Sequence, residues 1–326
     1  MAGIRVLDAH DVETAVAVLR QGGLLGLPTE TVYGLAADAD SQAAVARIYH
    51  VKGRPLDHPV IVHIPDVTKV SDWAREFPEY AQALAAAFWP GPMTLVLPRT
   101  SRAQDFVTGS QDTVALRVPG HPVALGVLRS FGGGVAAPSA NQFGAVSPTS
   151  ARHVLHDLSE RLDADIDAVI DGGECGVGLE STIIDCTGSY PRILRPGAIS
   201  AADVERVTGM AVGEPVSDIR APGTLDSHYA PAAAVRLVES SEELLQVVSE
   251  LSAAGYVGVI APEAVPTPVG AVRLSMPATN QHYAEELYAA LREADRLRLG
   301  VVVALLPQGT DIAVAVRDRL IRAAHG

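Results

Sequence analysis

Four short parts of the chain combine hydroxyl groups, glycines and cations, a mixture that suits the oxygens of a phosphate group. They are residues 28–35 (PTETVYGL), 52–55 (KGRP), 138–141 (PSAN) with 147–149 (SPT), and 178–182 (GLEST). Hydroxyls donate hydrogen bonds, glycines let backbone N–H groups approach, and Lys or Arg supplies positive charge. Each segment alone also has a structural explanation as a turn, a helix cap or a strand. Together they indicate a site for a phosphate-bearing ligand.

Two further polar residues lie within apolar runs. Arg117 belongs to the run 114–118, where a charge needs either a partner or a ligand, and this favours a functional role. His63 lies in the apolar segment 59–64, where a histidine is more often a core residue with satisfied hydrogen bonds.

The familiar catalytic signatures of other enzyme classes are missing from the sequence. It has no G-x-x-x-x-G-K-[ST] loop, no H-E-x-x-H and no G-x-S-x-G. A P-loop ATPase, a zinc protease and an α/β-hydrolase are therefore disfavoured. Ser181 follows Glu180, but no histidine spacing supports a serine nucleophile.

Alternating apolar patterns indicate the elements that must position these residues. We expect strands at residues 24–27, 59–64, 94–97, 114–118, 135–137, 168–170 and 181–185, and helices at 11–21, 41–50, 80–88, 122–130 and 149–158. This alternation predicts an α/β sheet with helices packed on it. In open α/β sheets the loops at strand ends line the ligand crevice, and the four polar segments lie at such ends.

The pattern breaks between about residues 208 and 232, where Pro, Gly and other turn formers accumulate. We therefore expect a first domain at 1–207, a linker at 208–232 and a small α/β domain at 233–326. Its expected strands are 235–238, 257–260 and 301–306, and its expected helices are 241–253, 281–297 and 311–323. This domain lacks a G-x-G-x-x-G fingerprint, which argues against a dinucleotide site there.

Composition excludes several classes of protein. Of the 326 residues, 48% are hydrophobic and 19% charged, which is typical of globular domains. The formal charge of −13 argues against a general nucleic-acid binder, because phosphate neutralisation needs clustered cations. Two cysteines are too few for a disulfide framework, and no signal-peptide layout or membrane-length apolar run is present. We expect a soluble cytoplasmic protein.

In their order and spacing, these segments resemble the YrdC-type threonylcarbamoyl-AMP synthases. The matching motifs are PTETVYGL, KGRP with PVIVH, FWPGPMTLVL, VALRVPGH, APSAN, SPT, DGG with GLESTI, and ILRPG, over about residues 5–205. The remainder resembles the smaller domain of the longer, two-domain form, through APGTLDSHYAP, QHYAEELYAALREAD and AVAVRDRLIRAA. The resemblance implies a twisted α/β sheet with a deep cleft, followed by a Rossmann-like domain.

The resemblance also implies a reaction. L-Threonine and bicarbonate give an N-carboxylated threonine, whose carboxylate attacks the α-phosphate of ATP and releases pyrophosphate. A tRNA threonylcarbamoyl-transfer complex would then use the threonylcarbamoyl-AMP to modify adenosine in tRNAs that read codons beginning with A. Mg²⁺ is expected with ATP, held largely by phosphates and water, and no organic cofactor is implied.

Matching motif positions imply roles for individual residues. L-Threonine would be surrounded by Thr31, His63, Arg117, Ala137 and Ser181, with Arg117 as the partner of its carboxylate. ATP or the adenylate would be held by Arg54, His58, Thr113, Ser139, Ser147, Arg195 and Tyr229, with Tyr229 folding back as part of a lid. Lys52 and Arg54 would supply catalytic charge. His58 departs from the two-domain family, which often has asparagine there, and a histidine's charge would depend on pH.

Two other functions stay open at this point. One is an RNA-binding module of the same fold, which the acidic charge and the lack of interleaved aromatics and cations disfavour. The other is a carbamoyl-transfer enzyme that shares the adenylating domain. Such enzymes are expected to carry further catalytic or zinc-binding modules, and the chain has no C-x-x-C pair. Direct binding of nucleic acid also stays open.

Overall fold

The computed structural model describes residues 3–214, 219–223, 229–252 and 256–325. The chain divides into two compact units, each described here by itself. The first comprises Met1–Phe143, Pro148–Gly176 and Glu180–Thr224. The second comprises Leu225–Gly326 together with two short segments, Gly144–Ser147 and Val177–Leu179. Two parts of the expected linker, 215–218 and 224–228, lie outside the described residues.

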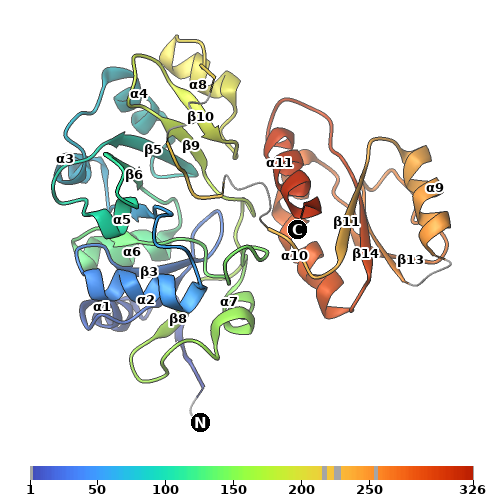
Figure 1. The fold of residues 1–326 in the computed structure, drawn as a ribbon, viewed down its shortest axis with the longest axis horizontal. Coiled ribbons are helices and arrows are strands. Elements are labelled where there is room, and N and C mark those ends of the chain that lie inside the picture. Colours follow the sequence, from blue (N-terminus) through green and yellow to red (C-terminus); the bar gives the residue numbers. More distant parts are fainter. Residues whose placement is uncertain (1–2, 215–218, 224–228, 253–255, 326) are drawn as a thin grey trace. The chain divides into compact units, whose positions relative to one another are not determined.

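A mixed sheet forms the centre of the first unit (Figure 1). Its strands are β1 (Arg5–Asp8), β2 (Leu25–Leu27), β3 (Gly34–Asp38), β4 (Ile61–His63), β5 (Met93–Pro98), β6 (Thr113–Arg117), β7 (Val135–Ala136), β8 (Ala168–Asp171), β9 (Thr182–Asp185) and β10 (Arg192–Arg195). Their order across the sheet is β1-β8-β2-β3-β7-β4-β6-β5-β9-β10. Because β4, β6, β5 and β9 are neighbours, residues far apart in the sequence meet in the middle of the sheet.

Helices pack on this sheet. They are α1 (Val12–Arg20), α2 (Gln42–Lys52), α3 (Val70–Trp73), α4 (Glu79–Phe88), α5 (Asp105–Thr108), α6 (Pro122–Phe131), α7 (Ala151–Leu158) and α8 (Ala201–Thr208), with a 3₁₀ turn η1 (Val67–Lys69). Helix α1 lies beside α6 and α4 beside α8 (Figure 1). Strand β3 shows how two cores arise, since Leu35 and Ala37 join one buried cluster and Ala36 the other. This alternation is the period of two that a strand imposes.

Local sequence explains where α2 ends, which matters for the basic segment that follows it. The Ser41 side chain accepts a hydrogen bond from the amide of Ala44, which caps the helix start. Gly53 ends the helix in the left-handed region with φ of 64°, a conformation that costs glycine little. Lys52 is therefore the last helical residue, and Arg54 lies just beyond the end.

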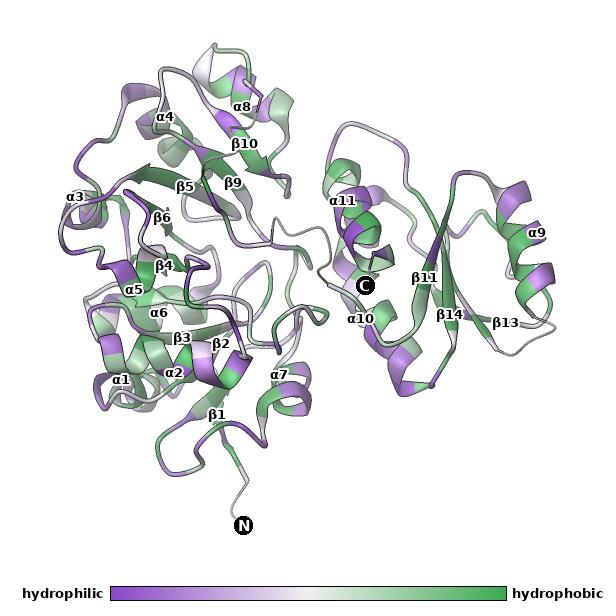
Figure 2. Ribbon diagram, in the orientation of Figure 1, coloured by the Kyte–Doolittle hydropathy of each residue, from purple (hydrophilic) through white to green (hydrophobic). Residues whose placement is uncertain are grey.

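The second unit contains a four-stranded, all-parallel sheet of order β11-β14-β12-β13. Its elements are β11 (Ala234–Val238), α9 (Ser241–Leu251), β12 (Val257–Ile260), β13 (Ala271–Ser275), α10 (Asn280–Arg296), β14 (Val301–Leu305) and α11 (Ala313–Ala324). Helix α9 covers one face of this sheet, and α10 with α11 covers the other (Figure 1). Figure 2 shows the strands of both units as mainly hydrophobic, whereas the helices carry hydrophilic residues along one side.

All the strands and helices expected from the sequence are present, with ends that differ by a few residues. The predicted α/β class with a Rossmann-like second unit is therefore confirmed. The apolar pattern missed the strands β1, β3, β10 and β13, the helix α8 and the short helical turns α3, α5 and η1. Strand β3 has the sequence GLAAD, which lacks β-branched residues, and four of the five residues of β13 are only partly buried.

Candidate active site

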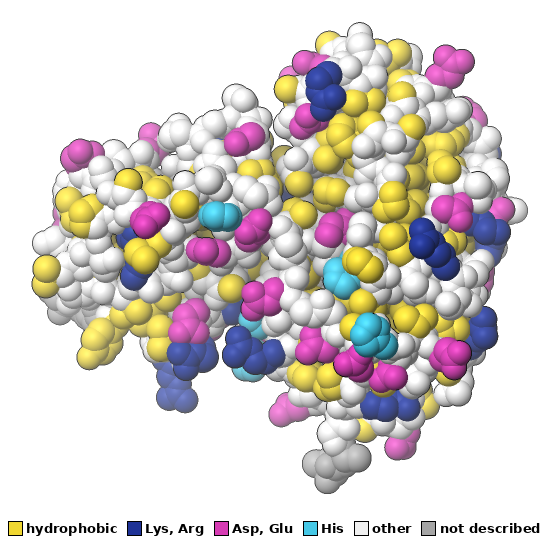
Figure 3. All heavy atoms as spheres, turned by 180° about the vertical axis from the view of Figure 1, so that it is seen from behind, with side chains coloured by type: hydrophobic (Ala, Val, Ile, Leu, Met, Phe, Trp, Pro, Cys, Tyr) yellow, Lys and Arg dark blue, Asp and Glu magenta, His cyan; other side chains and the backbone are white. Residues whose placement is uncertain are grey.

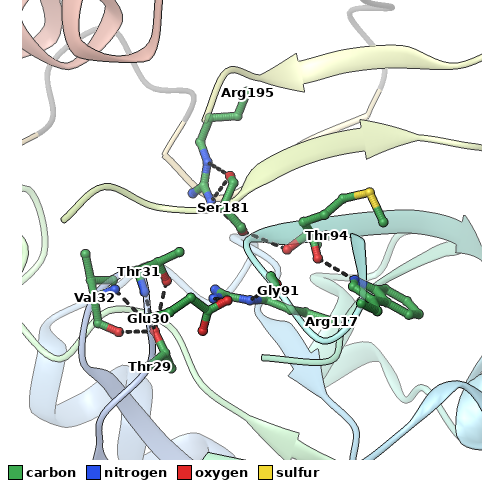
Figure 4. A network of polar contacts seen from close by, with 11 residues as sticks. Thr29, Glu30, Thr31, Val32, Gly91, Thr94, Arg117, Ser181 and Arg195 are labelled. Atoms are coloured by element: carbon green, nitrogen blue, oxygen red, sulfur yellow. Dashed lines mark hydrogen bonds and ion pairs between the residues drawn. The ribbon is translucent and has the colours of Figure 1, made fainter. Parts of the chain in front are cut away.

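Arg117, the last residue of β6, is the centre of the first group of site residues. Its side chain is 4% exposed, and Nη2 lies 2.7 Å from Oε1 of Glu30. Its Nε also donates to the carbonyl oxygen of Gly91 at 3.3 Å. Figure 4 shows the guanidinium between these two partners. The charge expected to need a partner therefore has one, as a buried ion requires.

His63 ends β4, which pairs in parallel with β6 so that His63 lies opposite Arg117. Side chains at paired positions project from the same face of a sheet, which brings the imidazole to the guanidinium. Burial and, secondly, the charge of Arg117 lower the pKa of His63 to about 3, so the ring is neutral at pH 7. Its buried Nδ1 has no hydrogen-bond partner among the residues described.

Ser181 connects the residues expected at threonine with those expected at ATP. Its Oγ lies 2.8 Å from the Oγ1 of Thr94, on β5. Arg195, at the end of β10, donates from Nη2 to the carbonyl oxygen of Ser181 at 2.8 Å and to its Oγ at 3.2 Å (Figure 4). Nη1 of Arg195 donates to the carbonyl oxygen of Pro222 at 2.8 Å. The arginine is thus fixed beside the serine.

The segment between β2 and β3 holds Thr31. This threonine is fully buried, and its Oγ1 lies 2.9 Å from the Oγ1 of Thr29. Thr29 Oγ1 in turn donates to the carbonyl oxygen of Val32 at 2.6 Å, which closes a tight turn. Ala137 follows β7, and its amide donates to the carbonyl oxygen of Ile61 at 3.1 Å.

Lys52 is held by backbone groups of the PSAN segment. Its Nζ donates to the carbonyl oxygens of Ser139 at 2.6 Å and Asn141 at 2.5 Å, and the residue is 3% exposed. Burial, and then the nearby charge of Arg54, holds the pKa of the Lys52 ammonium well below its usual range. Lys52 therefore fixes the backbone around Ser139 in this structure.

Arg54 and His58 follow the end of α2, and both contact Phe143. Nη2 of Arg54 donates to the carbonyl oxygen of Pro59 at 2.8 Å, and its guanidinium lies 5.8 Å from the ring centre of Phe143. The ring of His58 packs edge-on against the same phenylalanine, with 5.5 Å between centres. Burial and the charge of Arg54 lower the pKa of His58. Thr113 begins β6.

Ser147 and Tyr229 belong to the second unit, and their roles at ATP stay predictions. Ser147 is fully buried, and its carbonyl oxygen accepts a hydrogen bond from Nε of Arg292 at 3.3 Å. Tyr229 adopts a left-handed φ of 62° and is 1% exposed. Its ring stacks on that of Tyr288, with 5.7 Å between centres.

Sequence reasoning missed Glu30 and Thr94. Glu30 was visible inside PTETVYGL, and the expectation that Arg117 needs a partner was the signal that could have found it. Thr94 had no such signal, because a threonine in an apolar strand is explained by β-propensity alone.

One face of the molecule shows how its surface charges are distributed. On the face in Figure 3, Lys and Arg side chains lie as separate spots among Asp and Glu. Within the described ranges, no group of three His, Cys, Asp or Glu residues is arranged to hold a metal ion. No helix in that part of the chain has both the length and the apolar character needed to cross a bilayer.

Comparison with known proteins identifies the family. A family described as "Telomere recombination" (Sua5, YciO and YrdC) matches residues 17–197, and "Threonylcarbamoyl-AMP synthase, C-terminal domain" matches 199–325. A threonylcarbamoyl-AMP synthase of Bacillus subtilis is 39% identical, over 97% of this chain and 93% of its own. One from Pyrococcus abyssi is 38% identical, over 97% and 95%.

Solved structures agree with the sequence relatives. The crystal structure of P. abyssi Sua5 complexed with L-threonine matches with a TM-score of 0.90 and 37% identity. That match covers 99% of this chain and 97% of the other. The chain therefore belongs to the two-domain family of threonylcarbamoyl-AMP synthases and is an enzyme of the nucleotidyltransferase type.

Proposed function

We propose that the chain forms threonylcarbamoyl-AMP and pyrophosphate from L-threonine, bicarbonate and ATP. The observation that carries this proposal is the position of the Ser181 hydroxyl, whose Oγ lies 3.2 Å from Nη2 of Arg195 and 2.8 Å from Oγ1 of Thr94. It joins the side chains assigned to the amino acid with an arginine assigned to the nucleotide. The relatives' names and the threonine complex of P. abyssi Sua5 support the same reaction.

L-Threonine would bind around Arg117. A guanidinium suits a carboxylate because its N–H groups match the two oxygens. The neutral imidazole of His63 and the hydroxyls of Thr31 and Ser181 can exchange hydrogen bonds with the substrate's hydroxyl group. The small side chain of Ala137 would leave room for the substrate's methyl group.

ATP would bind through the cationic and hydroxyl side chains of the polar segments. Arg54 and Arg195 would offset the phosphate charge, and Ser139 would meet phosphate oxygens at the PSAN segment that Lys52 fixes. His58 and Thr113 would contribute further contacts. The remaining contacts assigned to the nucleotide would come from Ser147 and Tyr229. The role of Tyr229 as part of a lid is included in this proposal.

The reaction requires the protein to position the reactants and to supply positive charge. It requires no covalent bond between enzyme and substrate. The carboxylate of N-carboxylated threonine must lie in line with the α-phosphate bond that breaks. Negative charge that develops on the phosphate oxygens is stabilised by cations already in place. Mg²⁺ would arrive with ATP and neutralise phosphate charge, with phosphate oxygens and water as ligands. The adenylate would pass to a tRNA threonylcarbamoyl-transfer complex.

The test is pyrophosphate release by the purified full-length chain. Release is expected only when ATP, bicarbonate and L-threonine are all present. Omission of threonine should reduce it to the level of a control without enzyme. Pyrophosphate release that does not depend on threonine would contradict the proposal and point to hydrolysis of ATP alone.

A further inference from the structure

Glu30 has one carboxylate oxygen in use and one without a partner. Oε1 pairs with Nη2 of Arg117 at 2.7 Å, and the side chain is 17% exposed. Oε2 is buried and has no hydrogen-bond partner in the part of the chain that the structure describes. An ionised carboxylate oxygen without a donor is costly in a buried position, so this oxygen calls for a ligand that donates.

The unpartnered oxygen has complementary neighbours. Within the described residues, Arg117 uses Nε and Nη2 for Gly91 and Glu30 and makes no further hydrogen bond through Nη1. Nδ1 of His63, on the adjacent strand, also lacks a partner. An acceptor, a cationic donor and a neutral imidazole thus remain available together.

We propose that Glu30 binds the α-ammonium group of the amino-acid substrate and so fixes the position of its nitrogen in the site. This inference rests on the proposed function, because it assigns a second charge contact within the same substrate site. An α-amino acid carries its ammonium and carboxylate on one carbon atom. The ion pair of Glu30 and Arg117 presents the opposite charges side by side. Each substrate charge can therefore contact a protein charge of opposite sign while the ion pair stays intact.

The arrangement explains why a site that binds several anions contains a carboxylate. ATP, bicarbonate and the substrate carboxylate are all repelled by Glu30. The ammonium is the substrate's one positive group, so Glu30 can fix which way round the amino acid enters. With the carboxylate at Arg117 and the nitrogen at Glu30, the substrate's side chain is left for His63, Thr31 and Ser181.

The test compares two ligands that differ only in the amino group, with the full chain in titration calorimetry. (R)-3-Hydroxybutanoate is L-threonine without its amino group, and it keeps the carboxylate and the hydroxyl. Glu30→Gln retains the size of the side chain and removes its charge. We expect this variant to bind L-threonine about tenfold to hundredfold more weakly, the loss of one charge-assisted hydrogen bond. Its affinity for (R)-3-hydroxybutanoate should be unchanged or higher.

Glu160→Gln is the matched control, because Glu160 is exposed and belongs to no segment assigned to the substrates. It should bind both ligands as the unaltered chain does. An equal loss of both ligands in Glu30→Gln would overturn the proposal, since Glu30 would then act only by holding Arg117. Unchanged threonine binding would overturn it as well.

A second variant keeps the question answerable if Glu30→Gln does not fold. Glu30→Asp preserves the charge and withdraws it by one methylene, so it should weaken threonine selectively, by less than Gln does. Equal weakening of both ligands by Glu30→Asp would again reject the assignment. The unaltered chain distinguishes failure of the Glu30 assignment from failure of the proposed function. If the unaltered chain releases pyrophosphate with threonine but the Glu30 variants do not bind as expected, only the Glu30 assignment fails.

Discussion

Replacement of Lys52 by methionine distinguishes two roles for this residue. Lys52 either holds the backbone of the PSAN segment or contacts the substrates directly. Lys52→Met keeps the length and the apolar stem of the side chain but removes the ammonium group. In the structure that group donates to the carbonyl oxygens of Ser139 at 2.6 Å and Asn141 at 2.5 Å. The substitution therefore leaves two carbonyl groups without this donor.

The magnitude follows from two opposing terms. A buried polar group that loses its partner costs about 1–3 kcal/mol, so two carbonyls cost about 2–6 kcal/mol. Methionine removes the penalty of burying the ammonium, a penalty that also lowers the pKa of Lys52. We therefore expect the free energy of unfolding to fall by about 2–4 kcal/mol.

Urea unfolding of Lys52→Met and the unaltered chain measures this difference, and steady-state kinetics measures its effect on the site. The KM for ATP should rise more than the KM for threonine, because Ser139 lies in the segment assigned to ATP. Lys52→Arg is the control that keeps the charge. A variant with full stability and no activity would refute the reasoning, since Lys52 would then act on the substrates directly.

Three further predictions concern Arg117, His63 and Gly197. Arg117→Gln leaves the Glu30 carboxylate without its cation and should weaken threonine binding at least tenfold in calorimetry; equal affinity would remove Arg117 from the threonine site. The pKa of His63 is about 3 when folded and 6.5 in its ordinary state, so the unfolded chain takes up the proton first as the pH falls. Between pH 7 and pH 5 the unaltered chain should therefore lose about 2 kcal/mol more stability than His63→Gln, and parallel losses in urea titrations would contradict this. Gly197→Ala would place a Cβ in steric conflict with the amide nitrogen of Thr182, so its melting temperature should fall, and an unchanged melting temperature would contradict this.

The sequence predicted most of the fold because the apolar periodicity of the main strands and helices is strong. The run that ends at Arg117 is an example, since it reads as a buried strand and forms β6. Strands with a weak apolar pattern were not predicted. Strand β3 is rich in alanine, and β13 lies at the edge of its sheet with most residues only partly buried. For such strands, tertiary packing rather than local propensity decides the structure.

The site was predictable in its residue types and much less in its contacts. Burial of a charge in an apolar run indicated that Arg117 needs a partner, and the structure contains one. The identity of that partner was out of reach, because Glu30 and Arg117 are separated by 87 residues in the sequence. Ser181 and Thr94 are equally far apart, at 87 residues. Such pairs arise only from the order of strands across the sheet, which periodicity does not specify.

Lys52 shows a different limit of sequence reasoning. Its place in KGRP predicted a cation beside phosphates, a role that no contact in the structure yet tests. The structure shows the ammonium group bound to backbone carbonyls instead. Backbone acceptors carry no sequence signature, since every residue supplies a carbonyl group.

The most direct test of the central claim is one incubation of the full-length chain with bicarbonate, labelled L-threonine and ATP labelled at the α-phosphate, followed by chromatography. One site that holds an amino acid beside a nucleotide should give a single product that carries both labels, together with pyrophosphate. The Arg117→Gln variant should give little of it. If the two labels never appear in one compound while ATP is consumed, the account of a shared threonine and nucleotide site is wrong.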